Sequence, residues 1–428
     1  MMSVEGPYLV AIIARLDAPV VNLAAFGVAF AFAIIIESPV MMLMSASTAL
    51  VDDRESYLAL RRFAYMLGAL LTLVQLVILA PPIFGALAGL LSLPEEVARL
   101  AHGGLALMLP WSAAIGYRRF RQGLLIRAGR TRPIAYGTGV RLAAMSATAY
   151  LAFRFSTLPG TFIGGLSLSA GVVLEAVAVR LMTTRLVGAV CERRRTPSRM
   201  GDLRLGQLTS FYTPLALTSL LSLASLPTVT FFMGQSRGAL ESLAVLPVVH
   251  GLTFIFRSLG LSYLEVVIAL LGRTREHFAM IRNFAVGLGL VAAGSLIVIA
   301  YTPLALVWFR EVSGLSDELT RFAIMPARIL AVMPALSVLL ALERGLLIHA
   351  RQNTPITWAT LIELAGIAIM LSVGIHVLNL VGAVAAAIAI LCARVAGTAW
   401  LFPTCLHVLR KRPLVTTQTI SPAPSDAT

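Results

Sequence analysis

The chain has 428 residues, of which 58% are hydrophobic and only 13% are charged, and its mean hydropathy is +0.88. A water-soluble domain of this size could not cover its surface with so few polar side chains, so the composition excludes an ordinary soluble protein. The formal net charge of +14 would suggest a nucleic-acid partner in a soluble protein. Here the arginines lie in short segments between apolar stretches, where they act as topology signals, and we expect no nucleic-acid partner.

Sequence signatures of catalysis and of metal binding are missing from the chain. Cys191, Cys392 and Cys405 have neither metal-ligand nor disulfide spacing. There is no phosphate-binding GxxxxGKS or GxxxxGKT loop, and no HExxH or GxSxG motif. We therefore expect no enzyme, no metal site and no cofactor. Any energy for transport would have to come from a gradient, with Na+ or H+ as the candidate coupling ion.

Apolar stretches long enough to cross a bilayer core recur along the whole length. The sequence predicts an all-α integral membrane protein with about twelve transmembrane helices. The spans lie at roughly residues 7–16, 20–50, 57–80, 98–117, 137–157, 161–187, 209–233, 239–271, 281–302, 317–348, 356–377 and 380–408. Pro39, Pro110, Pro247 and Pro334 fall inside spans, where they are expected to produce kinks.

Basic residues follow every even-numbered span. They lie in the segments 54–62, 118–132, 193–204, 273–282, 344–351 and 410–412. The opposite loops are acidic and carry Asp17, Glu95, Glu96, Glu241, Asp317 and Glu318. Because positive loops stay on the cytoplasmic side, both termini are predicted to be cytoplasmic, in a multi-pass protein of a bacterial-type inner membrane.

One segment of the chain recurs in a similar form in the second half. Residues 123–133 read GLLIRAGRTRP and residues 345–355 read GLLIHARQNTP, an offset of 222 residues. Upstream, an offset of 220 places Pro7 on Pro227 and Ser38 on Ser258. The pattern predicts two parallel repeats of six helices each, related by an axis along the membrane normal.

The repeat divides the chain into four parts. We predict an N-terminal lobe at 1–187, a basic cytoplasmic linker at 188–208, a C-terminal lobe at 209–408 and a disordered cytoplasmic tail at 409–428. Span seven begins near residue 208, well before Pro227, whereas its partner would have to begin before residue 1. We therefore expect the first helix to be truncated, or the true N-terminus to lie upstream of Met1.

Ionisable residues inside spans are costly and are candidates for function. Glu37 corresponds to Arg257 at the offset of 220, and Arg141 corresponds to Glu363 at the offset of 222. The repeats thus place opposite charges at equivalent positions, twice. If the pseudo-twofold axis brings equivalent faces together, Glu37 would pair with Arg257 and Arg141 with Glu363, forming a substrate site or a gate between the halves. The alternative is a static structural pair, or a side chain that reaches the interface.

Four further charged residues are flanked by apolar ones and are weaker candidates for substrate binding or gating: Glu175, Glu265, Arg328 and Arg394. His250 aligns with Phe30, and we expect it to pack or to hydrogen-bond rather than to relay protons. The run from Arg118 to Arg132 is interpreted as a topology anchor, with binding of anionic lipid as the alternative.

Short sequences in the second half resemble a known superfamily of transporters. They are Pro214-Leu215-Ala216-Leu217, Ser225-Leu226-Pro227, Pro326 with Arg328 and Ile329, then Pro334, Gly345 and the stretch from Gly382 to Ala389. With the two parallel six-helix repeats, this is similar to the superfamily of multidrug and toxic compound extrusion (MATE) transporters and oligosaccharide flippases, MOP. Within it the chain most resembles the progressive ankylosis (ANK) family, over about residues 209–400; residues 1–190 match in topology only.

The ANK resemblance implies export of organic or phosphate-bearing anions, and the multidrug relatives imply exchange of cationic drugs for Na+ or H+. In multidrug relatives an acidic coupling residue often lies in helix one, which is short here, and Asp17 does not replace it. The sequence predicts a monomeric secondary transporter of the efflux type that moves a small, anionic organic substrate through the lipid bilayer by rocking two lobes. A flippase for a lipid-linked precursor, a cation or multidrug antiporter, and a membrane protein without transport remain alternatives.

Overall fold

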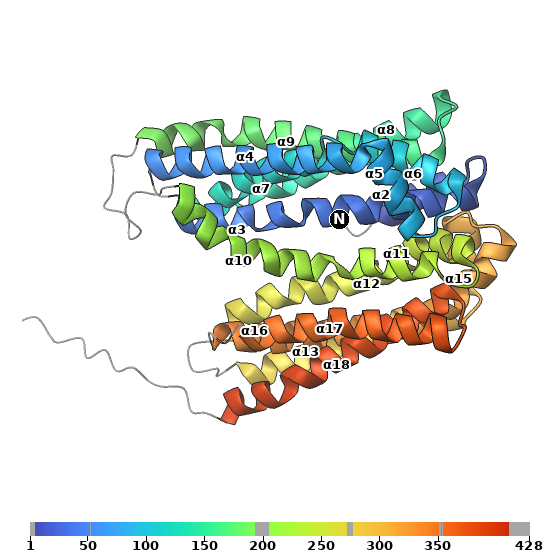
Figure 1. Ribbon diagram of the computed structural model, residues 1–428. Coiled ribbons are helices and arrows are strands. Elements are labelled where there is room, and N and C mark those ends of the chain that lie inside the picture. The colour runs from blue at the N-terminus through green and yellow to red at the C-terminus, as the bar shows by residue number, and fades with distance from the viewer. Residues whose placement is uncertain are drawn as a thin grey trace, which may run out of the picture.

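The structure, a computed structural model, describes residues 5–51, 53–192, 205–271, 277–350, 352 and 354–410. The described part is helical throughout and forms two lobes (Figure 1). The N-terminal lobe contains α1 (Glu5–Ile13), α2 (Pro19–Glu37), η2 (Ser38–Met42), α3 (Leu43–Leu50), α4 (Arg54–Leu79), α5 (Pro81–Leu90), α6 (Glu95–Leu107), α7 (Trp111–Arg127), α8 (Arg132–Phe155) and α9 (Gly160–Glu192).

The C-terminal lobe repeats this order. It contains α10 (Leu205–Leu223), α11 (Ser225–Gly234), α12 (Ala239–Leu270), α13 (Phe278–Tyr301), α14 (Leu304–Leu306), η3 (Val307–Val312), α15 (Asp317–Ile329), η4 (Leu330–Val332), α16 (Met333–His349), α17 (Thr354–Ser372), η5 (Val373–Val377) and α18 (Gly382–Arg410). Helix α1 corresponds to α11 at the offset of 220. Helix α11 is preceded by a further long helix, α10; within the described residues α1 has no such counterpart.

The repeat seen in the sequence is also present in the contacts. Helices α9 and α18 begin at Gly160 and Gly382, the same offset of 222. In one lobe the Thr161 backbone N–H donates to Asn22 Oδ1 at 3.0 Å, and in the other the Ala383 N–H donates to Ser242 Oγ at 3.1 Å. A backbone N–H at the start of α9 is therefore bonded by a side chain of α2, and the corresponding N–H of α18 is bonded by a side chain of α12, the helix equivalent to α2.

Eight helices of the described chain are long and apolar enough to cross a membrane. The outer helices α4 and α13 expose apolar side chains: Leu73 is 57% and Leu290 is 68% exposed. In water such faces would be unstable, whereas lipid is their natural surroundings. The protein is therefore a multi-pass membrane protein. The number of twelve spans stays a prediction.

The prolines break helices at three of the four expected places. Pro39 lies in the 3-10 segment η2, Pro110 separates α6 from α7, and Pro334 follows the 3-10 segment η4. A proline removes one helical hydrogen bond and clashes with the preceding turn, which explains these breaks. Pro247 lies inside α12, which continues through it.

The two lobes touch at one end of the molecule and separate at the other (Figure 1). At the closed end, a Cβ on Gly27 of α2 would lie 3.5 Å from the Leu243 carbonyl oxygen of α12. There the Arg15 guanidinium donates to the Glu311 carbonyl, and Gln235 Nε2 donates to the Leu90 carbonyl at 3.4 Å. Between the lobes, α10 lies along η2, where Ser219 Oγ donates to the Ser38 carbonyl at 2.5 Å.

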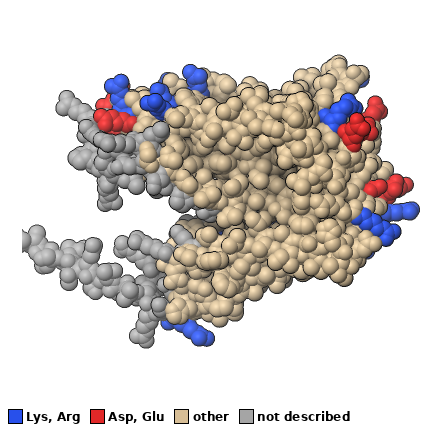
Figure 2. Space-filling view, in the orientation of Figure 1, with Lys and Arg blue, Asp and Glu red and all other residues tan. Residues whose placement is uncertain are grey.

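The open end carries the ends of α3, α9 and α18 and the start of α10. Figure 2 shows a hollow between the lobes at this end. Basic and acidic side chains both lie at this end and at the closed end (Figure 2). The predicted linker 188–208 and tail 409–428 lie largely outside the described residues.

Candidate functional site

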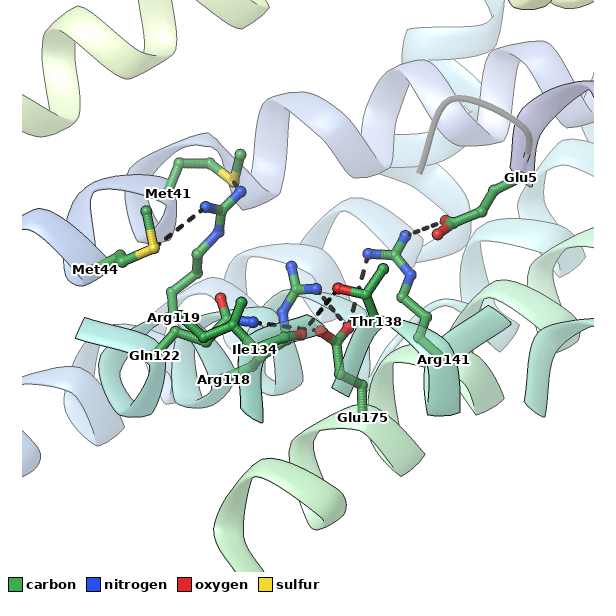
Figure 3. Close-up of polar contacts among 10 residues, drawn as sticks. All are labelled: Glu5, Met41, Met44, Arg118, Arg119, Gln122, Ile134, Thr138, Arg141 and Glu175. Atoms are coloured by element: carbon green, nitrogen blue, oxygen red, sulfur yellow. Dashed lines mark hydrogen bonds and ion pairs between the residues drawn. The ribbon is translucent and has the colours of Figure 1, made fainter. Parts of the chain in front are cut away.

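A buried cluster of charged side chains occupies the middle of the N-terminal lobe, and Glu175 of α9 is its centre (Figure 3). Arg118 Nη1 of α7 lies 2.5 Å from Glu175 Oε2, and Arg141 Nη1 of α8 lies 3.9 Å from the same oxygen. Gln122 Nε2 donates to the other carboxylate oxygen at 3.3 Å. The Glu175 side chain is 0% exposed. One carboxylate thus ties α7, α8 and α9 together.

Arg141 extends this cluster to two more helices. Its Nη2 lies 2.7 Å from Glu5 Oε2 of α1, and Glu5 is itself buried. The Arg141 guanidinium also lies over the Trp111 ring, 5.7 Å from its centroid. Trp111 Nε1 in turn donates to the Glu37 carboxylate of α2. We refer to Glu5, Glu37, Trp111, Arg118, Gln122, Arg141 and Glu175 as the N-lobe network.

Small residues make the close approach of α8 and α9 to this network feasible. A Cβ on Gly171 would meet the Arg141 carbonyl oxygen and Met145 Cβ, each at 3.1 Å. A Cβ on Gly137 would lie 3.1 Å from Val179 and 3.6 Å from Glu175 Cγ. The glycines therefore bring the two backbones near enough for Arg141 to lie within 3.9 Å of Glu175, as small residues do between membrane helices.

Arg119 points away from the network, toward η2 and α3 (Figure 3). Its terminal nitrogens contact two thioether sulfurs, Met41 Sδ at 3.6 Å and Met44 Sδ at 3.9 Å. Arg121, also buried in α7, donates to Thr183 Oγ1 of α9 at 2.8 Å. With Arg119 and Arg121 included, four arginines and three glutamates lie in this region.

The C-terminal lobe carries a smaller set of charges. Glu363 Oε1 of α17 lies 2.7 Å from Arg394 Nη2 of α18. Arg257 Nε of α12 donates to Ser337 Oγ at 3.3 Å. Arg328 Nε donates to the Ala300 carbonyl at 3.1 Å, and its guanidinium lies over the Tyr301 ring. Each of these contacts joins two helices of the same lobe.

The expected pairing between the lobes is therefore corrected. Glu37 bonds to Trp111 rather than to Arg257, and Arg141 pairs with Glu5 and Glu175 rather than with Glu363. The physical reason is that equivalent charges lie inside each lobe, where partners on neighbouring helices are nearer than any group across the lobe boundary. The side chain of Glu265 lies outside the described part of the structure.

Sequence reasoning missed Glu5, Trp111, Arg118 and Gln122 as members of a site. The sequence predicts Arg118 as part of a basic anchor at the membrane surface, but α7 continues to Arg127 and Arg118 is only 2% exposed. A usable signal was present: residues 118, 121, 122 and 125 follow helical spacing and are all buried. Glu5 carried no such signal, because only the fold brings α1 against α8.

Metal-ligand geometry does not appear in the described residues, where no three His, Cys, Asp or Glu side chains gather in a way that could hold an ion.

No family model and no curated protein matches the sequence. Solved structures match over nearly the whole chain. A multidrug resistance MATE family transporter of the MOP superfamily, in an inward-facing conformation, shares 15% identity over 96% of this chain and 97% of its own, with a TM-score of 0.72. The lipid II flippase MurJ, in an inward closed conformation, shares 13% identity over 94% of this chain and 85% of its own, with a TM-score of 0.73.

The Vibrio cholerae MATE transporter VcmN in its bent form shares 15% identity over 95% of this chain and 94% of its own. Its TM-score is lower, 0.55. Identities this low show a common fold and nothing finer. The chain thus has the fold of MATE and MurJ structures, which confirms the expected all-α membrane architecture of two similar lobes.

Proposed function

We propose that this protein is a secondary transporter that moves a small organic substrate across the membrane by rocking its two lobes. The observation that carries the proposal is the asymmetry between the ends: the lobes pack tightly at one end and separate at the other, leaving a hollow (Figure 2). Two lobes of equivalent construction can exchange these arrangements without changing their internal packing.

The open end is proposed to face the cytoplasm. Arg54, Arg127 and Arg410 lie at this end, and cytoplasmic loops are enriched in arginine. The two neighbours with the higher TM-scores are both named as inward conformations, which supports the same orientation. The end of α18 would then be cytoplasmic, as expected from the sequence, whereas α1 starts at Glu5 inside the N-terminal lobe (Figure 1); a cytoplasmic N-terminus stays a prediction.

The N-lobe network is proposed to couple transport to H+ or Na+. Protonation of Glu175, or a cation beside it, would weaken its ion pairs with Arg118 and Arg141 and loosen α7, α8 and α9 relative to one another. In the other lobe, the Glu363–Arg394 pair is the corresponding gate candidate, with Arg328 and Glu265 as further candidates.

The substrate is proposed to be a small organic anion, and the protein to be a transporter rather than an enzyme. The resemblance of residues 209–400 to the ANK family supports an anion, and so do the intramembrane arginines Arg257 and Arg328. The alternatives are a lipid-linked precursor, since one neighbour is named as a lipid II flippase, and a cationic drug, since others are named as MATE transporters.

Transport into proteoliposomes tests the proposal with one probe for each class. The probes are 14C-labelled 4-phenylbutyrate as the anion, tritiated tetraphenylphosphonium as the cation, and a fluorescent polyprenyl phosphate assayed by dithionite quenching. We expect the anion to move faster than in protein-free vesicles, and Glu175→Gln to abolish the difference. Glu192→Gln, an exposed carboxylate of the same helix, is the control and should transport normally. Equal rates with and without protein for all three probes would contradict the proposal.

A further inference from the structure

Two hydrogen bonds cross the lobe boundary at the closed end, and the internal repeat relates one to the other. Arg15, in the turn after α1, donates through its guanidinium to the Glu311 carbonyl of η3. Gln235, in the turn after α11, donates through Nε2 to the Leu90 carbonyl of α5 at 3.4 Å. Arg15 and Gln235 occupy equivalent positions at the offset of 220. Each lobe thus sends one side chain into the other from the same place in its own repeat. We call the two bonds the closed-end latches.

The accepting carbonyls also lie in equivalent turns. Just after α5 and just after η3, the chain passes through a left-handed residue, Ser92 with a φ of 51° and Gly314 with a φ of 73°. These two residues are related by the offset of 222. The last carbonyls of a helix lack partners within it, so a donor from the other lobe can use them.

The Arg15 latch is more closely built than the Gln235 latch. Its guanidinium also donates to the Ala11 carbonyl of α1 at 2.7 Å, so Arg15 bridges the lobes with one bond to each. Gly314 leaves room for this side chain, because a Cβ there would lie 2.9 Å from Arg15 Nη1. On the other side, a Cβ on Gly234 would lie 2.1 Å from the Leu91 carbonyl oxygen. Only glycine therefore lets the end of α11 pass so near the N-terminal lobe.

The latches differ in chemistry as well as in position. A bond donated by a charged group is stronger than one between neutral groups, so Arg15 should hold the closed end more firmly than Gln235. Arg15 is exposed and Gln235 is half-buried. When the lobes part, each donor can exchange its carbonyl for water, so that no buried polar group is left without a partner.

Other contacts between the lobes have a different character. Within the described residues, the remaining hydrogen bonds between the lobes come from α10, where Tyr212 and Ser219 donate to carbonyls of η2. Around the latches the closed end packs through apolar groups, as where Gly27 meets Pro247. Apolar packing has no preferred direction. The latches are therefore the contacts at this end that select one arrangement of the lobes.

We propose that Arg15 and Gln235 are paired gate residues, which hold the closed end shut and must both let go before it opens. The inference rests on the proposed function, because it requires a second arrangement in which this end is open. It goes further by naming the side chains that set the balance between the two arrangements, one in each repeat.

The test is the distance between two spin labels, measured by double electron–electron resonance on the purified full chain in nanodiscs. Glu96 of α6 and Glu318 of α15 are exposed at the closed end and are related by the offset of 222 (Figure 1). Labelled cysteines replace them in a background without the three native cysteines. We expect Arg15→Ala combined with Gln235→Ala to raise the ratio of long to short distances at least about threefold, because two hydrogen bonds are lost from one arrangement only.

Further variants separate a latch from a general loss of charge or stability. Arg15→Ala combined with Gln235→Arg moves the stronger latch to the other repeat and should return the ratio toward that of the wild type. Arg15→Gln places at position 15 the residue found at 235 and should have a smaller effect than Arg15→Ala. The control Arg99→Ala removes another exposed arginine near the closed end, on α6, and should leave the distances unchanged.

The outcomes separate this inference from the proposed function. Unchanged distances in the double alanine variant, or an equal change in Arg99→Ala, would overturn the latches even if transport is observed. A shift that depends on Arg15 and Gln235, in a protein that transports none of the probes, would uphold the latches and refute transport. Size-exclusion profiles and melting temperatures establish that each variant is folded. If the double alanine variant does not fold, Arg15→Gln alone carries the test with the same expected direction.

Discussion

Arg141 and Glu363 occupy equivalent positions of the two repeats, carry opposite charges, and each pairs with the helix that follows it in its own lobe. Arg141 of α8 approaches Glu175 of α9, and Glu363 of α17 pairs with Arg394 of α18. The two pairs join equivalent helices, but the arginine lies on the first helix of the pair in the N-terminal lobe and on the second in the C-terminal lobe. The two repeats thus share the place of an ion pair but not its direction.

Removal of Glu175 should destabilise the N-terminal lobe strongly. Glu175→Gln leaves Arg118 and Arg141 buried with one acceptor fewer, and loss of one partner of a buried pair costs about 3–5 kcal/mol. We expect a clear fall in the melting temperature of the detergent-solubilised protein, measured by intrinsic fluorescence. Glu192→Gln at the exposed end of α9 should leave it unchanged. Equal melting temperatures for both variants would show that the network does not contribute to stability.

Exchange of charges should succeed within a lobe and fail between lobes. Glu363→Arg combined with Arg394→Glu reverses a pair whose atoms lie 2.7 Å apart, so the double variant should regain stability that each single variant loses. Glu37→Arg combined with Arg257→Glu should show no such recovery, because Glu37 bonds to Trp111 and Arg257 to Ser337. Melting temperatures of the four single and two double variants give both coupling energies. A positive coupling between positions 37 and 257 would revive the pairing across the lobes.

Replacement of Glu343 should stabilise the protein rather than weaken it. The residue is 4% exposed, and neither carboxylate oxygen has a hydrogen-bond partner in the described structure. An unsatisfied buried polar group costs about 1–3 kcal/mol, and a nonpolar side chain of similar size removes that cost. We expect Glu343→Met to raise the melting temperature. The comparison variant Glu363→Met, which removes a paired carboxylate, should lower it; a fall in both would mean that Glu343 has a stabilising partner in the membrane.

A covalent link at the closed end should stop transport. Gly27 of α2 and Pro247 of α12 are in contact, since a Cβ on Gly27 would lie 3.6 Å from Pro247 Cδ. In a background without Cys191, Cys392 and Cys405, cysteines at 27 and 247 should join on oxidation or through a short thiol-reactive bridge. Uptake into proteoliposomes should fall to the protein-free rate and return on reduction. Each single-cysteine variant serves as the control, and full activity of the linked protein would refute opening at this end.

Sequence periodicity predicted much of this fold, because a membrane imposes long apolar helices and a repeat imposes their order. The offset of 222 recurs in the starts of α9 and α18, and the prolines at 39, 110 and 334 mark real breaks. The charged residues inside spans were also identifiable, since their cost singles them out wherever they occur. Glu37, Arg141, Glu175, Glu363 and Arg394 all lie in buried or partly buried polar contacts.

Partners within the site could not be predicted in the same way. Whether Arg141 meets Glu5, Glu175 or Glu363 depends on the rotation of each helix and on which helices are neighbours, and neither is encoded in hydropathy. The sequence by itself determined the membrane class, the two repeats and the positions where their charges are opposite. Only the tertiary structure decided that these charges pair inside each lobe, because close packing places their partners on neighbouring helices of the same lobe, as Gly137 and Gly171 do between α8 and α9.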